Sequence, residues 1–385
     1  MKQKICIVTG TRAEYGLYRP LLTRIKNDKR YTLQIIATGT HFSSKHGNTY
    51  QEIISDGFKI DRKVVLQLKG NKPIDIAITS GKALAGIGKA IKELNPDLII
   101  LLGDRYEILA AATAAHLLSV PVAHMHGGEL TEGSLDDSMR HAITKLSTLH
   151  FTSAEPYRKR VIQMGENRAH VFNTGATGVE NCIHLKKKTK SILEKDLAIR
   201  LKNPLAVVTM HPATNESVST THQIAALLKA LEKFPELQLV ITYPNADAGN
   251  ELIVKAIHHF AEKRDDVYIY KSLGVVNYLS LLKYADVVIG NSSSGIIEVP
   301  SFGIPVVNIG DRQKSRLAAK SVIHVVAEEK RIVQAIEKAL SVSFRNSCKN
   351  VKNPYGDGNA SRNIMQVLHK FKNFRTIEKK FHDIK

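Results

Sequence analysis

A chain of 385 residues is long for one hydrophobic core and favours two domains, since single cores stop growing at roughly 250–300 residues. Its 55 Lys and Arg residues outnumber its 36 Asp and Glu residues and give a formal charge of +19. No apolar run approaches the ~18 residues that span a bilayer, so we expect a cytoplasmic protein without a membrane partner. The three cysteines are far apart, which argues against a disulfide framework and a cysteine-based zinc site.

The positive charge alone does not predict a nucleic-acid partner. The densest basic stretches are residues 184–190 and 370–380, and neither accompanies a helix-turn-helix, zinc-finger or aromatic single-strand motif. A net positive charge of this kind increases solubility and attracts small anions. We therefore expect no nucleic-acid partner. The excess of positive charge is compatible with an anionic small-molecule substrate.

Short apolar runs alternate with helical patterns from the first residues onward. Such alternation predicts right-handed βαβ crossovers and parallel sheets, hence an α/β fold of two doubly wound domains. In the first half, the expected strands are 5–9, 33–37, 98–102, 120–124 and 150–152, and the helices are 15–26, 74–94, 105–118 and 138–146. In the second half, the expected strands are 206–209, 239–242, 267–269, 287–289, 306–309 and 323–325, and the helices are 223–233, 251–262 and 276–284.

The Lys-rich stretch 184–203 separates the two sets of elements and ends in Asn203 and Pro204. A second break at 353–358 precedes a last amphipathic segment, 361–371. We expect one domain over 1–183, a second over 184–358, and a C-terminal helix and tail over 359–385 that packs back on the first domain.

The densest group of acids and bases lies in the first half. Asp104 and Arg105 follow the buried strand 97–103, and ligands of open α/β sheets bind at the carboxyl ends of the strands. His126, Glu129 and the pair Asp136–Asp137 follow within about forty residues. If the strand continues through His124 and His126, the two rings share one side and form a possible metal site with Asp104 and Glu129. No second histidine pair supports a metal there.

Two strand-to-helix turns are suited to anions. Residues 9–16, with Arg12, form the first turn, and residues 286–298 repeat the arrangement in the second half. We expect the second turn to open a helix near Gly295, with Glu298 in its first turn and hydroxyls from Ser292, Ser293 and Ser294. The first turn lacks the glycine spacing of a dinucleotide site and the lysine of a P-loop, so NAD binding and P-loop NTPase activity are not expected.

Taken in order, these motifs resemble the hydrolysing UDP-N-acetylglucosamine 2-epimerases of sialic-acid-type biosynthesis, within the nucleotide-sugar 2-epimerase family. The matching blocks are residues 11–15, 103–105, 126–129, 136–145, 210–212, 244–249, 290–295 and 310–313. The resemblance implies two Rossmann-like domains around a cleft (the GT-B arrangement), no cofactor, no metal, and UDP-GlcNAc as the small-molecule partner. A homodimer or homotetramer is the assembly that we expect.

The resemblance also implies the reaction and the residues. UDP leaves as the C2 proton is removed, a glycal-like intermediate is hydrated, and ManNAc and UDP are released for nonulosonic (sialic) acid biosynthesis. The acid/base and catalytic positions match Asp104, Arg105, His126, Glu129, Asp136, Asp137 and His211. The positions that contact the nucleotide match Arg12, His211, Asn245, Ser292, Ser293, Ser294, Gly295, Glu298 and Arg312. His126 stands where many relatives have a catalytic Glu.

Four alternatives stay open at this point. A GDP-GlcNAc 2-epimerase of legionaminic acid biosynthesis would show very similar blocks, and a non-hydrolysing epimerase would pass through the same elimination. A GT-B glycosyltransferase would share the nucleotide contacts, but it would need an acceptor groove where this chain has its Asp/Glu/His cluster. A noncatalytic basic module is the last, and its binding to nucleic acid should weaken steeply with salt.

Overall fold

The computed structural model describes residues 2–44, 47–66, 72–131, 135–212, 218–244 and 249–383. The chain forms two compact units. Unit 1 comprises Met1–Glu129, Leu135–Asn181 and Tyr355–Lys385, and unit 2 comprises Leu130–Ser134 and Cys182–Pro354. None of the described helices is long and apolar enough to cross a membrane.

Unit 1 contains a parallel sheet of seven strands in the order β3-β2-β1-β4-β5-β6-β7. Its strands are β1 (Gln3–Thr9), β2 (Tyr31–Ala37), β3 (Arg62–Lys63), β4 (Leu98–Leu102), β5 (Val122–Met125), β6 (Leu149–Thr152) and β7 (Val171–Asn173). Its helices are α1 (Arg12–Asn27), α2 (Tyr50–Ser55), α3 (Pro73–Leu94), α4 (Tyr106–Leu117), α5 (Leu135–Leu146), α6 (Glu155–Gln163), α7 (Thr177–His184, whose end enters unit 2) and α15 (Ala360–Leu368), with short 3-10 turns at Gly39–Phe42, Arg168–His170 and Phe374–Thr376.

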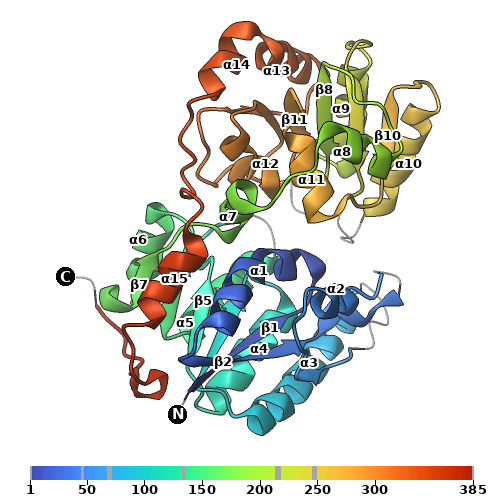
Figure 1. The fold of residues 1–385 in the computed structure, drawn as a ribbon. Helices are drawn as coiled ribbons and strands as arrows, with labels where there is room; N and C mark the ends of the chain where they lie inside the picture. The colour runs from blue at the N-terminus through green and yellow to red at the C-terminus, as the bar shows by residue number, and fades with distance from the viewer. Residues whose placement is uncertain are drawn as a thin grey trace. The chain divides into compact units, whose positions relative to one another are not determined.

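Both faces of this sheet are covered, as the near-continuous apolar strands require. Alternate residues of β1 point to opposite faces: Ile5 and Ile7 pack with α1 and α15, and Cys6 and Val8 pack with α3 and α4. The C-terminal helix α15 lies beside α1, although more than three hundred residues separate them in the chain (Figure 1). The last segment of the chain therefore completes the core of unit 1.

Unit 2 contains a parallel sheet of six strands in the order β10-β9-β8-β11-β12-β13. Its strands are β8 (Leu205–Thr209), β9 (Gln238–Thr242), β10 (Val267–Tyr270), β11 (Val287–Gly290), β12 (Val306–Ile309) and β13 (Val322–Val325). Its helices are α8 (Lys190–Leu197), α9 (Thr220–Leu231), α10 (Asn250–Ala261), α11 (Gly274–Leu282), α12 (Ser293–Ile297), α13 (Glu329–Leu340) and α14 (Val342–Cys348), with a 3-10 turn at Val299–Phe302.

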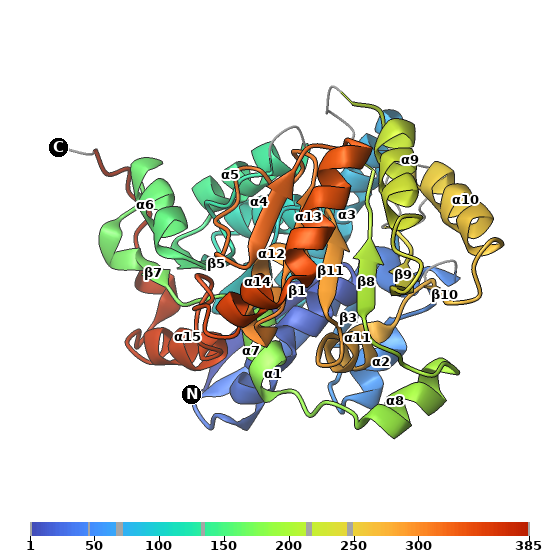
Figure 2. The same cartoon turned by 90° about the horizontal axis from the view of Figure 1, so that it is seen from above.

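The second sheet is also covered on both faces. One face carries α9, α10 and α13, which lie next to one another (Figure 2). The other face carries α8 and α11. The structure thus shows the α/β class predicted from the sequence, with two parallel sheets and helices on both sides of each.

Candidate active site

The acids and bases of unit 1 gather where β4 and β5 end. Leu102 pairs with Met125 in the parallel ladder, so the segments after these two residues leave the sheet side by side. Gly103 turns the chain with a φ of 88°, Asp104 follows, and Arg105 is the N-cap residue of α4. Sequence reasoning placed these residues at the carboxyl edge of the sheet, and the structure confirms that position.

Arg140 of α5 is the centre of this group, although the sequence did not single it out. Its side chain is only 2% exposed. Its Nη2 donates to the Asp104 carboxylate, and its Nη1 donates to Asp137 Oδ1 at 3.2 Å and to the Glu129 carbonyl oxygen at 2.9 Å. A planar guanidinium can serve several acceptors at fixed angles, so Arg140 fixes groups from three separate segments. Asp136 lies beside Asp137 in the first turn of α5.

His126, Glu129 and Ser153 form a second hydrogen-bonded group. Glu129 Oε1 lies 2.8 Å from His126 Nδ1 and accepts a hydrogen bond from the Ser153 hydroxyl at 2.6 Å. All three residues are buried, and within the described part of the chain His126 Nε2 has no hydrogen-bond partner. A carboxylate on one ring nitrogen fixes the orientation of an imidazole and leaves the other nitrogen for proton transfer.

The strand does not continue through His126, contrary to the expectation from alternation. β5 ends at Met125, and His126 has a φ of 63°, in the left-handed region that few non-glycine residues adopt. The strain is held by the following turn, where a Cβ on Gly128 would come within 2.5 Å of the Tyr157 carbonyl oxygen. His126 is therefore aimed by this turn, and strain of this kind is common at functional sites.

His124 has a structural role and is separate from His126. It is fully buried, with Nε2 2.8 Å from the Gly103 carbonyl oxygen and Nδ1 3.1 Å from Thr144 Oγ1. Burial lowers the pKa of His124 to about 3, so its ring is neutral at ordinary pH. Among the described residues, no group of three or more His, Cys, Asp or Glu side chains is arranged to hold a metal ion.

Arg105 and Arg12 lie on neighbouring segments of unit 1. Arg105 Nε donates to Glu107 Oε1 at 2.7 Å, and about a third of its side chain is exposed. Arg12 opens α1 directly after the N-cap Thr11, and its Nη1 lies 3.9 Å from Glu52 Oε1. Both cations thus stand at the starts of helices that follow neighbouring strands, β1 and β4.

In unit 2, His211 and Arg312 meet at a residue that the sequence analysis passed over, Asn291. The Asn291 side chain accepts from the His211 backbone N–H at 2.7 Å and donates to the His211 carbonyl oxygen at 3.0 Å. Arg312 Nη1 donates to the Asn291 carbonyl oxygen at 3.1 Å. Burial, together with the positive charge of Arg312, lowers the pKa of His211 to about 3, so this ring acts as a neutral hydrogen-bonding group.

The serine turn of unit 2 differs in detail from the expectation. Its helix, α12, begins at Ser293 and ends at Ile297, so Glu298 is the C-cap residue and does not lie in the first turn. The Ser292 hydroxyl accepts from the Ser294 backbone N–H, and the Ser294 hydroxyl donates to the Glu298 carboxylate. Burial raises the pKa of Glu298.

Two other residues of unit 2, Gly295 and Asn245, were predicted to contact the nucleotide. Gly295 lies where α12 approaches β12, since a Cβ there would be 3.0 Å from Val306 Cγ1. Asn245 lies outside the described residues.

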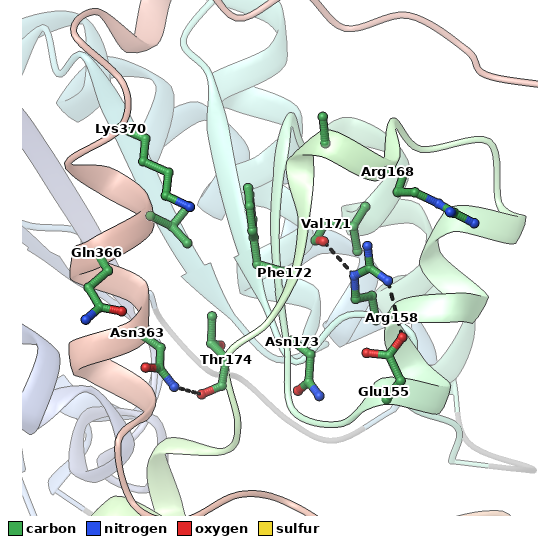
Figure 3. A pocket seen from close by; sticks show the side chains of 12 residues that line it. Glu155, Arg158, Arg168, Val171, Phe172, Asn173, Thr174, Asn363, Gln366 and Lys370 are labelled. Atoms are coloured by element: carbon green, nitrogen blue, oxygen red, sulfur yellow. Dashed lines mark hydrogen bonds and ion pairs between the residues drawn. The ribbon is translucent and has the colours of Figure 1, made fainter.

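A hollow of about 520 Å³ lies elsewhere on unit 1, and its lining includes none of the predicted site residues. Figure 3 shows that Arg158 is turned toward Glu155 and the Val171 carbonyl oxygen, and that Asn363 donates to the Thr174 carbonyl oxygen. Because this hollow contains none of the predicted site residues, the candidate site remains at the ends of β4 and β5.

Comparisons with known proteins identify a family and agree with this fold. The family model for UDP-N-acetylglucosamine 2-epimerase matches residues 23–369. A Campylobacter jejuni protein named GDP/UDP-N,N'-diacetylbacillosamine 2-epimerase (hydrolyzing) is 42% identical over 348 residues, covering 89% of each chain. The Escherichia coli polysialic acid biosynthesis protein P7 is 38% identical and covers 99% of this chain and 98% of its own.

The fold is also similar to that of a solved structure. The crystal structure of UDP-GlcNAc 2-epimerase from Neisseria meningitidis bound to UDP-GlcNAc has a TM-score of 0.85 and 22% sequence identity, and the match covers 96% of this chain and all of the other.

Proposed function

Because the chain belongs to the UDP-N-acetylglucosamine 2-epimerase family, we propose that it is a hydrolysing 2-epimerase of a nucleotide-linked 2-acetamido sugar. The observation that carries the proposal is the pair of groups at the ends of β4 and β5. One is a buried imidazole held by Glu129 and Ser153, with Nε2 left for a proton. The other is a pair of carboxylates, Asp104 and Asp137, held by Arg140.

The first half of the reaction is an elimination. The C1–O bond to the nucleoside diphosphate breaks, the bonding electrons leave with the diphosphate, and a base takes the C2 proton. The C2–H is a poor acid until C1–O cleavage builds positive charge on the ring, so a base beside C2 and carboxylates beside the ring are both required. The proposed base is His126, and Asp104, Asp136 and Asp137 stabilise the ring charge.

The second half hydrates the glycal-like intermediate. Water adds its oxygen to C1, and a proton returns to C2 on the opposite face, which gives the inverted sugar. Inversion at C2 requires a second proton donor across the ring from the first, and the Arg140-held carboxylates supply candidates for it. We assign Asp104 to this step: it takes up a proton from water after the elimination and then delivers a proton to C2, from a segment separate from the one that carries His126.

We propose that unit 2 holds the nucleotide. The resemblance assigns eight residues of this unit to the nucleotide: His211, Asn245, Ser292, Ser293, Ser294, Gly295, Glu298 and Arg312. Neutral His211 is suited to a hydrogen bond with an uncharged group or a phosphate oxygen, whereas Arg312 supplies the charge. Asn291 positions both by its contacts with the His211 backbone and with Arg312.

The substrate that we propose is UDP-GlcNAc, which gives UDP and ManNAc for nonulosonic acid synthesis. The name of the Escherichia coli relative supports that pathway. The name of the Campylobacter jejuni relative favours a second candidate, N,N'-diacetylbacillosamine linked to GDP or UDP.

Product analysis by NMR tests these alternatives. UDP-GlcNAc, GDP-GlcNAc and the UDP- and GDP-linked forms of N,N'-diacetylbacillosamine are supplied separately in the presence of a chelator, with the Asp104→Asn variant as the control. We expect free ManNAc and UDP from UDP-GlcNAc. Turnover of GDP-GlcNAc alone would change the base, and turnover of a bacillosamine nucleotide alone would move the substrate to the second candidate. Turnover of none of the four would contradict the proposed function.

A further inference from the structure

Two buried glutamates of unit 1, Glu14 of α1 and Glu107 of α4, meet around Gly10. Glu107 is fully buried and Glu14 is 6% exposed. The Gly10 backbone N–H donates to Glu14 Oε2 at 2.8 Å. A Cβ on Gly10 would lie 2.7 Å from Glu107 Cγ and Oε1, so the Glu107 side chain packs directly on this glycine. The two carboxyl groups thus enclose the turn that leads to Arg12.

The hydrogen bonds of these carboxyl groups are incomplete. Among the described residues, Glu14 Oε1 and Glu107 Oε2 are buried without a partner. The cation in contact is Arg105, whose Nε donates to Glu107 Oε1 at 2.7 Å. The charged and titratable groups that face Glu14 are Glu107, Arg105 and Asp104, together with Tyr18. Two buried carboxylates with one shared guanidinium leave an uncompensated negative charge, which is costly away from water.

We propose that Glu14 and Glu107 share one proton, which Glu14 carries at neutral pH, and that they act as a positioning pair for Arg105 and the Gly10–Arg12 turn. The role of Arg105 and Arg12 toward the substrate rests on the proposed function. A proton on one of the two carboxyl groups removes the uncompensated charge, and it also gives that group a donor for an oxygen that has no partner among the described residues. In agreement, burial and the neighbouring Glu107 raise the pKa of Glu14 to about 8.

The pair would couple two neighbouring segments at the carboxyl edge of the sheet. Glu14 holds the turn after β1 through the Gly10 N–H, and Glu107 holds Arg105, which follows Asp104 after β4. Loss of the shared proton above about pH 8 would place an additional negative charge next to Arg105. That charge would compete with an anionic substrate for the guanidinium, so turnover should fall on the alkaline side.

The test that does not depend on activity is a pH titration of the full chain by NMR, with ¹³C in the glutamate carboxyl groups. We expect one glutamate carboxyl to titrate near pH 8 and its signal to be absent from Glu14→Gln. Glu93→Gln, which changes an exposed glutamate paired with Arg62, is the matched control and should leave that signal in place. If no glutamate titrates above about pH 6, the shared proton is wrong, whatever reaction the protein catalyses.

Kinetic measurements then distinguish a positioning role of Glu14 from a purely structural role. Glu14→Ala should lower kcat/KM at least about tenfold, since small displacements of substrate-positioning groups reduce rates strongly. Glu14→Gln should keep most of the wild-type kcat/KM at pH 7, because its amide can donate to Glu107 in place of the proposed proton. The same variant should lose the decline in turnover at alkaline pH. Glu107→Gln should raise KM more than it lowers kcat. An alkaline limb in Glu14→Gln equal to that of the wild type would overturn the proposal.

Discussion

The Glu129→Gln substitution examines the proposed base most closely. Glu129 Oε1 contacts His126 Nδ1 at 2.8 Å and the Ser153 hydroxyl at 2.6 Å. Gln preserves the size of the side chain and one acceptor oxygen, but it removes the negative charge. An imidazolium formed when Nε2 takes a proton would then stand in a buried site without its counter-charge.

The size of the effect follows from these contacts. A hydrogen bond to a charged group contributes about 1.5–3 kcal/mol, and the contact with His126 gains its charge only as the proton moves. Each ~1.4 kcal/mol of lost transition-state stabilisation is tenfold in rate, so kcat should fall roughly 10–150-fold. Ser153→Ala leaves both the carboxylate and its contact with His126, so it should cost less, within about tenfold.

Single-turnover measurements with UDP-GlcNAc give this comparison, because they report chemistry separately from product release. Circular dichroism and a denaturant titration of each variant show whether the fold is retained. The expected order of rates is wild type, Ser153→Ala, then Glu129→Gln. A folded Glu129→Gln protein with kcat within twofold of the wild type would refute the assignment of His126 as a base oriented by Glu129.

The remaining predictions concern neighbouring groups. Asp104→Asn should lower kcat by roughly 10²–10⁴, the usual contribution of one acid/base group, and a decrease below threefold in steady-state assays would remove Asp104 from the chemistry. His126→Ala should lose most turnover, whereas His126→Glu should keep a measurable part of it if His126 fills the role of the usual Glu; equal rates for the two variants would argue against that equivalence. His124 and His211 are buried and neutral, with pKa values near 3 against 6.5 for an exposed histidine. The unfolded chain therefore binds more protons between these values, and the free energy of unfolding should fall as pH drops below about 6.5, by up to ~2 kcal/mol per histidine at pH 5. Glu14, whose pKa is raised to about 8, acts in the opposite direction over this range, so the histidine contribution is isolated by comparison with a variant. Urea titrations of the wild type and of His211→Gln at pH 7 and 5 measure it, and an equal change in stability with pH in the two proteins would contradict it.

Much of the fold is predictable because the buried strands leave a strong pattern. Leu98–Leu102 and Val287–Gly290 are short apolar runs closed by glycine, and both form central strands. The edge strands β3 and β7 have two and three residues, too few for a recognisable pattern, and the sequence analysis missed them.

The candidate site was predictable in outline only. Asp104 and Glu129 could be placed near one another because parallel strands end at the same edge. The left-handed backbone at His126 could not be predicted, because the alternating pattern suggests that the strand continues, whereas β5 ends at Met125. The central position of Arg140 could not be predicted, because its contacts with Asp104 and with the Glu129 carbonyl oxygen join segments outside α5 that come together only in the folded chain.

Turnover of UDP-GlcNAc in D₂O tests the central claim most directly. If a side-chain base removes the C2 proton and a second group returns one after exchange with solvent, NMR should show free ManNAc with deuterium at C2, together with UDP. ManNAc that keeps hydrogen at C2, or a sugar released with its original configuration at C2, would contradict elimination and rehydration at this site.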